Sequence, residues 1–396
     1  MPMRPCWVEI RAQNLEENYR FLTTLAGGDA ELLAIVKADA YGHSLGLCAP
    51  AAVRAGAQWL GVTSVEEGVA ARKLCAGARV LVIGGIFAGQ GAAVVEHALT
   101  AVVWEPGQID ELESAARAAG ALPASIPVHL EIDTGMSRQG VSPDGLDAAL
   151  ARFGVWSPLR LEGVMTHLFA ADEADGRVTG QQLARLGEAL RRIEDLGLFP
   201  DWLNVGNSAA LLSGAAGRIA ALAARHGMKA MLRPGLALYG LAPRFEPGFE
   251  PDLEPEGVGA AVTGLKPVLS WKTRVVSVRQ VPEDALVGYN GSFVATEPMR
   301  LALLAVGYGD GLDRRLGNRF ALLVRGEHAP LVGRISMDQA VLDVTGIAGV
   351  ETGDEVVILG AQGDETITAF DHAEASGSIP WEVFTRICAR VRRVGV

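Results

Sequence analysis

The chain has 396 residues, of which 49% are hydrophobic and 20% charged, and its formal net charge is −11. At roughly 100–200 residues per domain, this length favours two domains, or a barrel-sized domain followed by a smaller one. The composition excludes a disordered chain, and the many glycines follow no Gly-X-Y period, which excludes a collagen-like one. The acidic balance favours a protein that acts on small molecules over one that binds nucleic acid.

The cysteines and the N-terminus indicate where the protein works. Cys6, Cys48, Cys75 and Cys388 have no metal-binding spacing, so we expect free thiols in a reducing compartment. The first residues contain no basic segment followed by an apolar one, so no secretory signal is predicted. No run of 18 apolar residues predicts a membrane span. We therefore expect a cytoplasmic protein.

The first part of the chain alternates strand-like and helix-like segments. Residues 1–10 are expected to form a strand that packs with a later β domain, and residues 11–243 to form the alternating domain. Its apolar strand-like segments are Leu32–Lys37, Trp59–Thr63, Arg79–Gly84, Leu99–Trp104, Pro127–Asp133, Leu161–His167, Trp202–Asn207 and Met228–Pro234. Helical patterns separate them, as in Ser64–Ala76, where Ser64 is a suitable cap with a glutamate at the third helical position. Eight strand–helix units predict a parallel sheet, and the count favours a closed (β/α)8 barrel over an open doubly wound sheet.

The pattern changes after residue 243. Residues 244–264 are rich in Pro, Glu and Gly and are expected to form a connecting loop. Residues 265–396 are predicted to form a mainly β domain with two late helices. Its expected strands are Leu269–Val281, Arg300–Val306, Phe320–Val324, Leu331–Ile335, Ala340–Val344 and Glu355–Leu359, with a hairpin turn at 325–328 and helices near Thr368–Ala375 and Trp381–Ala389.

The most informative residue is Lys37, at the end of the first predicted barrel strand. Burial lowers the pKa of a lysine and leaves a neutral amine that can form a Schiff base. Taken alone, a lysine at this position is more often one that extends its ammonium group to solvent at a strand end. Polar residues also end other predicted strands, among them His167, Asn207 and Arg233, and in barrels that end carries the chemistry.

The motifs around these residues resemble those of the alanine racemase family, in the same order over nearly the whole chain. The matching segments are Val36–His43, Leu130–Arg138, Gly163–Leu168 with Ala171–Glu173, Asn207–Ala210, Arg233–Gly240, Gly288–Tyr289, Val306–Gly311 and Gly333–Asp338. The resemblance implies a fold-type III barrel that binds pyridoxal 5′-phosphate (PLP), a C-terminal β domain, and a homodimer with shared active sites. It implies no nucleic acid, membrane or metal. The implied reaction is the interconversion of L-alanine and D-alanine.

The resemblance also implies roles for individual residues. Lys37 would be the Schiff-base lysine and one acid–base group, and Tyr289 of the partner subunit would be the other. Two groups on opposite faces suit racemisation, which removes a proton from one face of the α-carbon and adds one to the other. A tyrosine, whose ordinary pKa is about 10, is a poor base unless its phenolate is stabilised, and His167 would lie near it. Arg233 would face the pyridine nitrogen, to which it can donate a hydrogen bond but no proton.

The remaining implied roles concern cofactor and substrate binding. The cofactor would be held by Tyr41, Asn207, Ser208, the backbone of Gly235 and Leu236, and a C-terminal aromatic residue. Arg138 and the backbone at Met337 would hold the substrate carboxylate, since arginine suits a planar carboxylate through paired donors. Asp338 would orient the groups beside them.

The chain departs from the family pattern at three places. Glu131 stands where the family often has a lysine that becomes carbamylated, and we expect it to pair directly with Arg138. Trp381 stands in place of the tyrosine at the phosphate, and its indole can donate but not accept a hydrogen bond. The loop at 244–264 is longer than usual.

Three other functions remain open from the sequence. A racemase of broader specificity is one, because small changes in a pocket alter such preferences by only about 1–3 kcal/mol. A barrel-type PLP decarboxylase is less well supported, because such enzymes have a glutamate where Arg233 stands and a cysteine-bearing loop. A non-catalytic PLP-binding protein of the single-barrel type would lack the β domain.

Overall fold

The computed structural model describes residues 4–28, 30–173, 175–245 and 263–396. The chain folds as two compact units. The barrel unit comprises residues 13–40 and 48–266, and the β unit comprises residues 1–12, 41–47 and 267–396. The segment 41–47 therefore belongs to the β unit, although it lies in the sequence between barrel strands. Of the connecting loop expected at 244–264, residues 246–262 lie outside the described part.

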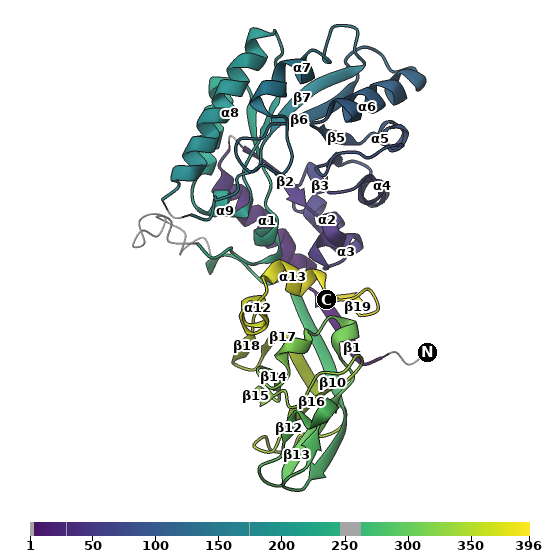
Figure 1. Cartoon of the computed structure of the whole chain (residues 1–396), viewed down its shortest axis with the longest axis vertical. Helices are drawn as coiled ribbons and strands as arrows, with labels where there is room; N and C mark the ends of the chain where they lie inside the picture. The colour runs from purple at the N-terminus through teal and green to yellow at the C-terminus, as the bar shows by residue number, and fades with distance from the viewer. Residues whose placement is uncertain (1–3, 29, 174, 246–262) are drawn as a thin grey trace. The chain divides into compact units, whose positions relative to one another are not determined.

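In the described part of the barrel unit, eight parallel strands close into a barrel in chain order, as predicted (Figure 1). They are β2 (Ala30–Ile35), β3 (Trp59–Val62), β4 (Arg79–Val82), β5 (Thr100–Val103), β6 (Ile126–Glu131), β7 (Leu159–Met165), β8 (Trp202–Asn204) and β9 (Lys229–Leu232). Most of their residues are apolar and buried, which is typical of a parallel sheet covered by helices. The barrel is closed because β2 pairs with β9.

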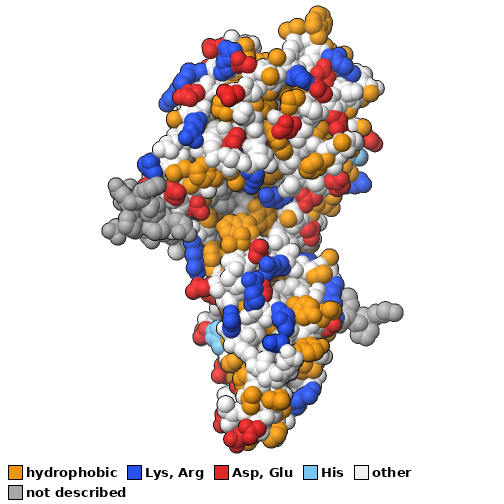
Figure 2. Space-filling view, viewed as in Figure 1, with side chains coloured by type: hydrophobic (Ala, Val, Ile, Leu, Met, Phe, Trp, Pro, Cys, Tyr) orange, Lys and Arg blue, Asp and Glu red, His pale blue; other side chains and the backbone are white. Residues whose placement is uncertain are grey.

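Helices follow the strands and lie outside the barrel (Figure 1). They are α1 (Ala12–Ala26), α3 (Leu45–Arg54), α4 (Val65–Leu74), α5 (Gly91–Glu96), α6 (Pro106–Ala118), α7 (Leu146–Leu150), α8 (Arg177–Asp195), α9 (Ser208–Leu212) and α10 (Ala216–Arg225). The segment labelled α2 (Lys37–Tyr41) is not a right-handed helix. The predicted start of α4 is confirmed, since the Ser64 side chain accepts a hydrogen bond from the Glu67 amide. On the face seen in Figure 2, acidic and basic side chains are intermixed over the barrel unit.

Polar side chains contact one another among the apolar side chains of the barrel. His129 is completely buried, and Gly163 leaves the space for its ring, because a Cβ there would come within 2.6 Å of it. The His129 Nδ1 lies 3.3 Å from the Asn204 amide nitrogen, and its Nε2 lies 3.7 Å from a Glu162 oxygen. Glu162 is paired with Arg79 at 2.6 Å. The buried carboxylate is thus compensated by a neighbouring charge, which burial requires.

The β unit is mainly β, as predicted. Over the residues described, nine strands form one sheet: β1 (Cys6–Ile10), β10 (Leu269–Val281), β13 (Met299–Leu304), β14 (Ala321–Val324), β15 (Glu327–Pro330), β16 (Ala340–Asp343), β17 (Glu355–Gln362), β18 (Glu365–Ile367) and β19 (Arg392–Gly395). Strands β11 (Leu286–Val287) and β12 (Phe293–Val294) pair separately. The N-terminal strand β1 lies between β10 and β19.

The second half also contains differences from the prediction. The hairpin turn consists of Arg325 and Gly326, both with positive φ, and Glu327 already pairs with Val324. The strand expected at Leu331–Ile335 lies earlier, at Glu327–Pro330, because the short turn brings the chain back into the sheet sooner. The helices α12 (Ala369–Ser376) and α13 (Pro380–Thr385) lie close to their predicted positions. Among the described residues, no helix is both long and apolar enough to cross a membrane.

Candidate active site

Lys37 begins an unusual turn directly after the barrel strand β2. Residues Ala38, Asp39, Ala40 and Tyr41 all have φ between 52° and 56°, which is a left-handed helical turn without glycine. For such residues this conformation costs roughly 1–2 kcal/mol each. Strain of this size persists only where the surrounding structure enforces it, and it is common at functional sites. The sequence pattern did not predict this turn, since alanine favours right-handed helices.

The environment of Lys37 disfavours the protonated form of its amine. The side chain is half-buried, and burial, followed by the charges of Arg138 and Arg233, lowers its pKa. The nearby carboxylate of Glu67 opposes this effect. A lysine with a lowered pKa is a better nucleophile at neutral pH than an exposed one. The direction of this change agrees with the expectation for Lys37, whose role as a Schiff-base lysine stays a prediction.

Arg233, which follows β9, is held rigidly at the same end of the barrel. Its Nη1 donates to the backbone carbonyl and to the side-chain oxygen of Asn204, at 2.7 and 2.6 Å. Its Nη2 donates to the Thr166 carbonyl at 2.9 Å. Burial lowers the pKa of Arg233 to about 10, so the guanidinium remains charged at neutral pH. It is a fixed cation that donates hydrogen bonds and does not give up a proton.

His167 lies beside this guanidinium in a defined protonation state. The Arg233 Nη2 is 3.3 Å from the His167 Nδ1, and arginine can only donate, so Nδ1 accepts. Burial and the charges of Arg233, Arg138 and Lys37 lower the pKa of His167 to about 3. The imidazole is therefore neutral at physiological pH, with its proton on Nε2.

The ion pair expected between Glu131 and Arg138 is not formed. Glu131, at the end of β6, is buried, and its Oε2 accepts a hydrogen bond of 2.5 Å from the Gln139 amide. Burial raises the pKa of Glu131. Arg138 is exposed and, among the described residues, has no hydrogen-bond or ion-pair partner. Gln139 is next to Arg138 in the same loop and is bound to Glu131, whereas the exposed guanidinium of Arg138 stays available to a ligand.

Ser208 and its neighbours connect the ends of β8 and β9. Asn207 is the N-cap of α9, with its side chain accepting from the Ala210 amide at 3.0 Å. The buried Ser208 hydroxyl accepts from the amides of Gly235 and Ala237, at 3.0 and 3.1 Å. The amide of Gly235, expected to bind phosphate, is thus used by Ser208, whose own proton is free to point elsewhere. Leu236 opens the short helix η2 (Leu236–Tyr239).

The other candidate residues belong to the β unit. Tyr289, in the short helix η3 (Tyr289–Gly291), is 65% exposed. It follows Gly288, which has a φ of 75° and a Cβ position only 2.8 Å from the Arg334 amide, so only glycine fits there. Tyr41 is buried, which raises its pKa to about 12 and keeps its hydroxyl protonated. Trp381 lies half-buried in the first turn of α13.

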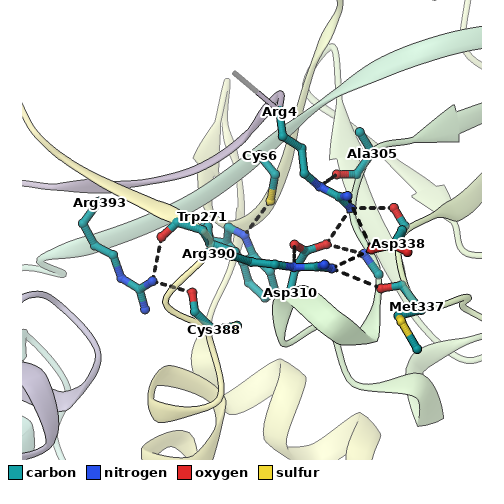
Figure 3. Close-up of polar contacts among 12 residues, drawn as sticks. Arg4, Cys6, Trp271, Ala305, Asp310, Met337, Asp338, Cys388, Arg390 and Arg393 are labelled. Atoms are coloured by element: carbon teal, nitrogen blue, oxygen red, sulfur yellow. Dashed lines mark hydrogen bonds and ion pairs between the residues drawn. The ribbon is translucent and has the colours of Figure 1, made fainter. Parts of the chain in front are cut away.

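Met337 and Asp338 form part of a charged cluster in the β unit (Figure 3). The buried carboxylate of Asp310 binds Arg4 and Arg390, each at 2.8 Å. Arg390 also binds the Asp338 carboxylate at 2.8 Å, and the Gly309 amide donates to the Met337 carbonyl at 2.8 Å. Met337 itself is 54% exposed. The cluster thus fixes the backbone of an exposed loop, and the orienting role of Asp338 stays a prediction.

Sequence reasoning missed several residues that hold the site together. Asn204 accepts hydrogen bonds from Arg233, and Gln139 donates one to Glu131. Buried Gln182 donates to the His167 carbonyl at 2.9 Å. Glu67 was noticed only as part of a helix start. No local pattern marks such residues, because each is defined by a partner from a different loop.

Comparison with known proteins identifies the family of both units. Residues 10–243 match the family described as alanine racemase, N-terminal domain, and residues 268–395 match alanine racemase, C-terminal domain. The chain belongs to the alanine racemase family. The resemblance predicted from the sequence motifs is therefore confirmed, as is the combination of a barrel with a β domain.

Individual alanine racemases are similar over their whole length. The chain is 36% identical to alanine racemase of Sorangium cellulosum, over 99% of both chains. It is 33% identical to alanine racemase 2 of Caldanaerobacter subterraneus, over 99% of this chain and 95% of that one. The crystal structure of alanine racemase from Streptomyces lavendulae has a TM-score of 0.87 and 32% identity, covering 100% and 98% of the two chains. That from Bacillus anthracis, with L-Ala-P bound, has a TM-score of 0.85 and 30% identity, covering 100% and 96%.

Proposed function

We propose that the chain interconverts L-alanine and D-alanine with PLP as its cofactor. The observation that carries this proposal is that Lys37, directly after β2, and the buried cation Arg233, directly after β9, lie at the same end of the barrel, where β2 pairs with β9. Membership of the alanine racemase family and full-length similarity to named alanine racemases support it.

The residues present fit PLP. The Lys37 amine would hold the cofactor covalently, and Arg233 would donate to the pyridine nitrogen. The Ser208 hydroxyl, with its proton not used by the two amides that it accepts from, is a suitable donor for a phosphate oxygen. Asn207, the Leu236 amide, the Tyr41 hydroxyl and the Trp381 indole are the further groups that we assign to the cofactor. When bound, PLP makes the α-proton of an amino acid acidic.

Two groups would move the proton. The Lys37 amine takes it from, or returns it to, one face of the substrate α-carbon, and the Tyr289 hydroxyl acts on the opposite face. The Nε2–H of neutral His167 is oriented by Arg233 and can donate to a phenolate oxygen, which would make tyrosine a better base. Arg233 would donate a hydrogen bond to the pyridine nitrogen without protonating it, and this would favour return of the proton over side reactions.

We assign substrate binding to Arg138 and Met337. Arg138 has an exposed guanidinium that no described group occupies, and paired donors suit a carboxylate. The Met337 backbone is fixed by the cluster around Asp310, with Asp338 as its orienting partner. A decarboxylase is disfavoured because a cation rather than a carboxylate stands at Arg233.

We further propose a homodimer in which Tyr289 and Met337 complete the site of the partner. Both are exposed, as are Leu286 and Tyr308 in the same unit, at 71% and 43%. Large apolar and aromatic side chains of this kind are typical of a surface that a second copy covers. The four cysteines, all in the described part of the chain, form no disulfide with one another, and three are buried, which favours a cytoplasmic location.

The test is incubation of the purified protein with PLP and L-alanine in heavy water. Nuclear magnetic resonance follows deuteration at the α-carbon, and chiral separation follows the enantiomers. We expect deuterated D-alanine without pyruvate or amine. Formation of an amine would point to a decarboxylase, and deuteration of serine or longer amino acids in preference to alanine would point to a broader racemase. No deuteration of any amino acid would contradict an enzymatic function.

A further inference from the structure

One carboxylate, that of Glu67, ties the left-handed turn after β2 to the neighbouring loop after β3. Its Oε1 accepts a hydrogen bond from the backbone amide of Asp39 at 3.3 Å. Its Oε2 accepts from the backbone amide of Thr63 at 3.0 Å. Asp39 lies two residues after Lys37, and Thr63 directly follows β3, which pairs with β2. A single side chain thus connects the turn that carries the lysine to the rim of the barrel.

The two contacts require a carboxylate. Both partners are N–H donors, so the side chain must present two acceptor atoms at once. A glutamine would offer one oxygen and one NH2 group, so one of the two backbone N–H groups would meet another donor instead of an acceptor. The start of α4 makes no such demand, because there the backbone amide of Glu67 donates to Ser64. The carboxylate thus binds the turn through one oxygen and, through the other, the residue directly before the cap of α4.

The turn needs such a constraint. Four consecutive residues without glycine adopt the left-handed conformation, which a chain keeps only where contacts enforce it. Before the turn, the Val36 amide donates to the Gly61 carbonyl at 2.8 Å, which fixes the end of β2. After Lys37, Glu67 is bound to the second residue of the strained segment. The lysine thus lies between two points that are both anchored to β3 and its loop.

The charge of Glu67 acts on the same lysine. Arg138 and Arg233 both disfavour a protonated Lys37, and His167 is neutral. Among the described residues, Glu67 is the acidic group whose charge acts in the opposite direction.

We propose that Glu67 is a positioning residue for Lys37: its carboxylate holds the strained turn in place against the loop after β3. This inference rests on the proposed function for the role of Lys37, but its structural part does not. Glu66 provides a matched control. It is the adjacent exposed glutamate of the same helix turn, and it binds the Gln90 side chain rather than the lysine turn.

The experiment compares Glu67→Gln, Glu67→Asp and Glu66→Gln with the unchanged full-length protein. Hydrogen exchange with mass spectrometry measures the protection of the Asp39 amide before PLP is added. Titration then measures the dissociation constant of PLP, and the pH dependence of PLP uptake reports on the Lys37 amine. For Glu67→Gln we expect about tenfold faster exchange and about tenfold weaker binding, the effect of losing one charge-assisted hydrogen bond. Its uptake should also reach half-maximum at lower pH, because loss of an anion lowers the pKa of a lysine.

The other variants distinguish the effect of side-chain length from the effect of charge. Glu67→Asp keeps the charge but is one methylene shorter, so we expect faster exchange with an unchanged pH midpoint. Glu66→Gln should match the unchanged protein in all three measurements. Unaltered exchange in Glu67→Gln, equal effects of the two glutamine variants, or faster exchange without weaker PLP binding would each overturn the inference. If the unchanged protein fails to bind PLP, the proposed function is wrong, while the exchange measurement still decides whether Glu67 holds the turn.

Discussion

The Arg233 guanidinium donates to Nδ1 of His167 over 3.3 Å, and this contact determines the state of the histidine. Because arginine has no acceptor, the histidine must present a lone pair at Nδ1 and carry its proton on Nε2. Arg233 is in turn fixed by the carbonyl groups of Asn204 and Thr166. The carbonyl groups of Asn204, in β8, and Thr166, directly after β7, therefore orient Arg233. Arg233 in turn occupies Nδ1 of His167 and leaves Nε2 as the atom that can donate.

The first prediction concerns the neutral state of His167. A histidine in an unfolded chain has a pKa of about 6.5, whereas in the folded site burial and three neighbouring cations lower it to about 3. Between these values the unfolded chain binds a proton that the folded site does not, so the free energy of unfolding decreases as the pH falls. Nitrogen NMR should show the Nε2–H tautomer throughout this range. The His167→Gln variant should lose this part of the pH dependence, and a His167 that titrates near its ordinary pKa would contradict the assignment.

Replacement of Lys37 tests the covalent attachment of the cofactor. The Lys37→Ala variant should bind PLP without the visible absorption of a lysine-bound cofactor and should lose racemisation, because no other amine is assigned to this position. The measurement is the absorption spectrum, with mass spectrometry after chemical reduction to locate any attached cofactor. Attachment at another lysine, or an unchanged spectrum, would refute the assignment.

Replacement of Tyr289 tests whether two groups act on opposite faces. The Tyr289→Phe variant retains the ring but lacks the hydroxyl, so proton removal from one enantiomer should slow more than removal from the other. Deuterium incorporation in heavy water, started separately from L-alanine and from D-alanine, measures the difference. Equal losses in both directions would remove the support for a base on one face. Tyr308→Phe, also an exposed tyrosine of the β unit, is the matched control.

The Gln139 amide should stabilise the buried Glu131 carboxylate. In Gln139→Ala the carboxylate loses its 2.5 Å hydrogen bond while remaining buried, which should lower the free energy of unfolding by about 1–3 kcal/mol. Urea denaturation of the single variants Gln139→Ala and Glu131→Gln and of their double variant measures the coupling between the two side chains. Additive effects would show that the contact contributes nothing.

The cluster around Asp310 should stabilise the loop that carries Met337. Asp310→Asn removes the charge that Arg4 and Arg390 share, and both arginines are partly exposed, so we expect a loss of about 1–2 kcal/mol. The KM for alanine should rise more than kcat falls, because Met337 is assigned to substrate binding and not to proton transfer. A lower kcat with unchanged KM would contradict this role.

The sequence by itself determined the order of the strands and helices and the family whose reaction the chain carries out. Short apolar segments ending in polar residues predicted the closed barrel, because strand and helix periodicity depend on near neighbours in the chain. The cap at Ser64 was predicted because it too depends on residues close together in the chain. Lys37, His167 and Arg233 were predicted from their places at strand ends and from motifs that follow the order of the family. Lys37 taken alone fits both a Schiff-base lysine and a solvent-directed lysine at a strand end, and only the family resemblance favours the first.

The tertiary structure alone decided which side chains meet. Glu131 binds Gln139 and not Arg138, because the loop after β6 brings the glutamine amide to the buried carboxylate and leaves the neighbouring arginine exposed. The left-handed turn after Lys37 forms in a segment without glycine, against its local preference, where Glu67 from the next loop accepts one of its amides. Hydrogen-bond partners and strained backbone depend on loops that are distant in sequence and adjacent at the barrel rim, and no local pattern encodes that proximity.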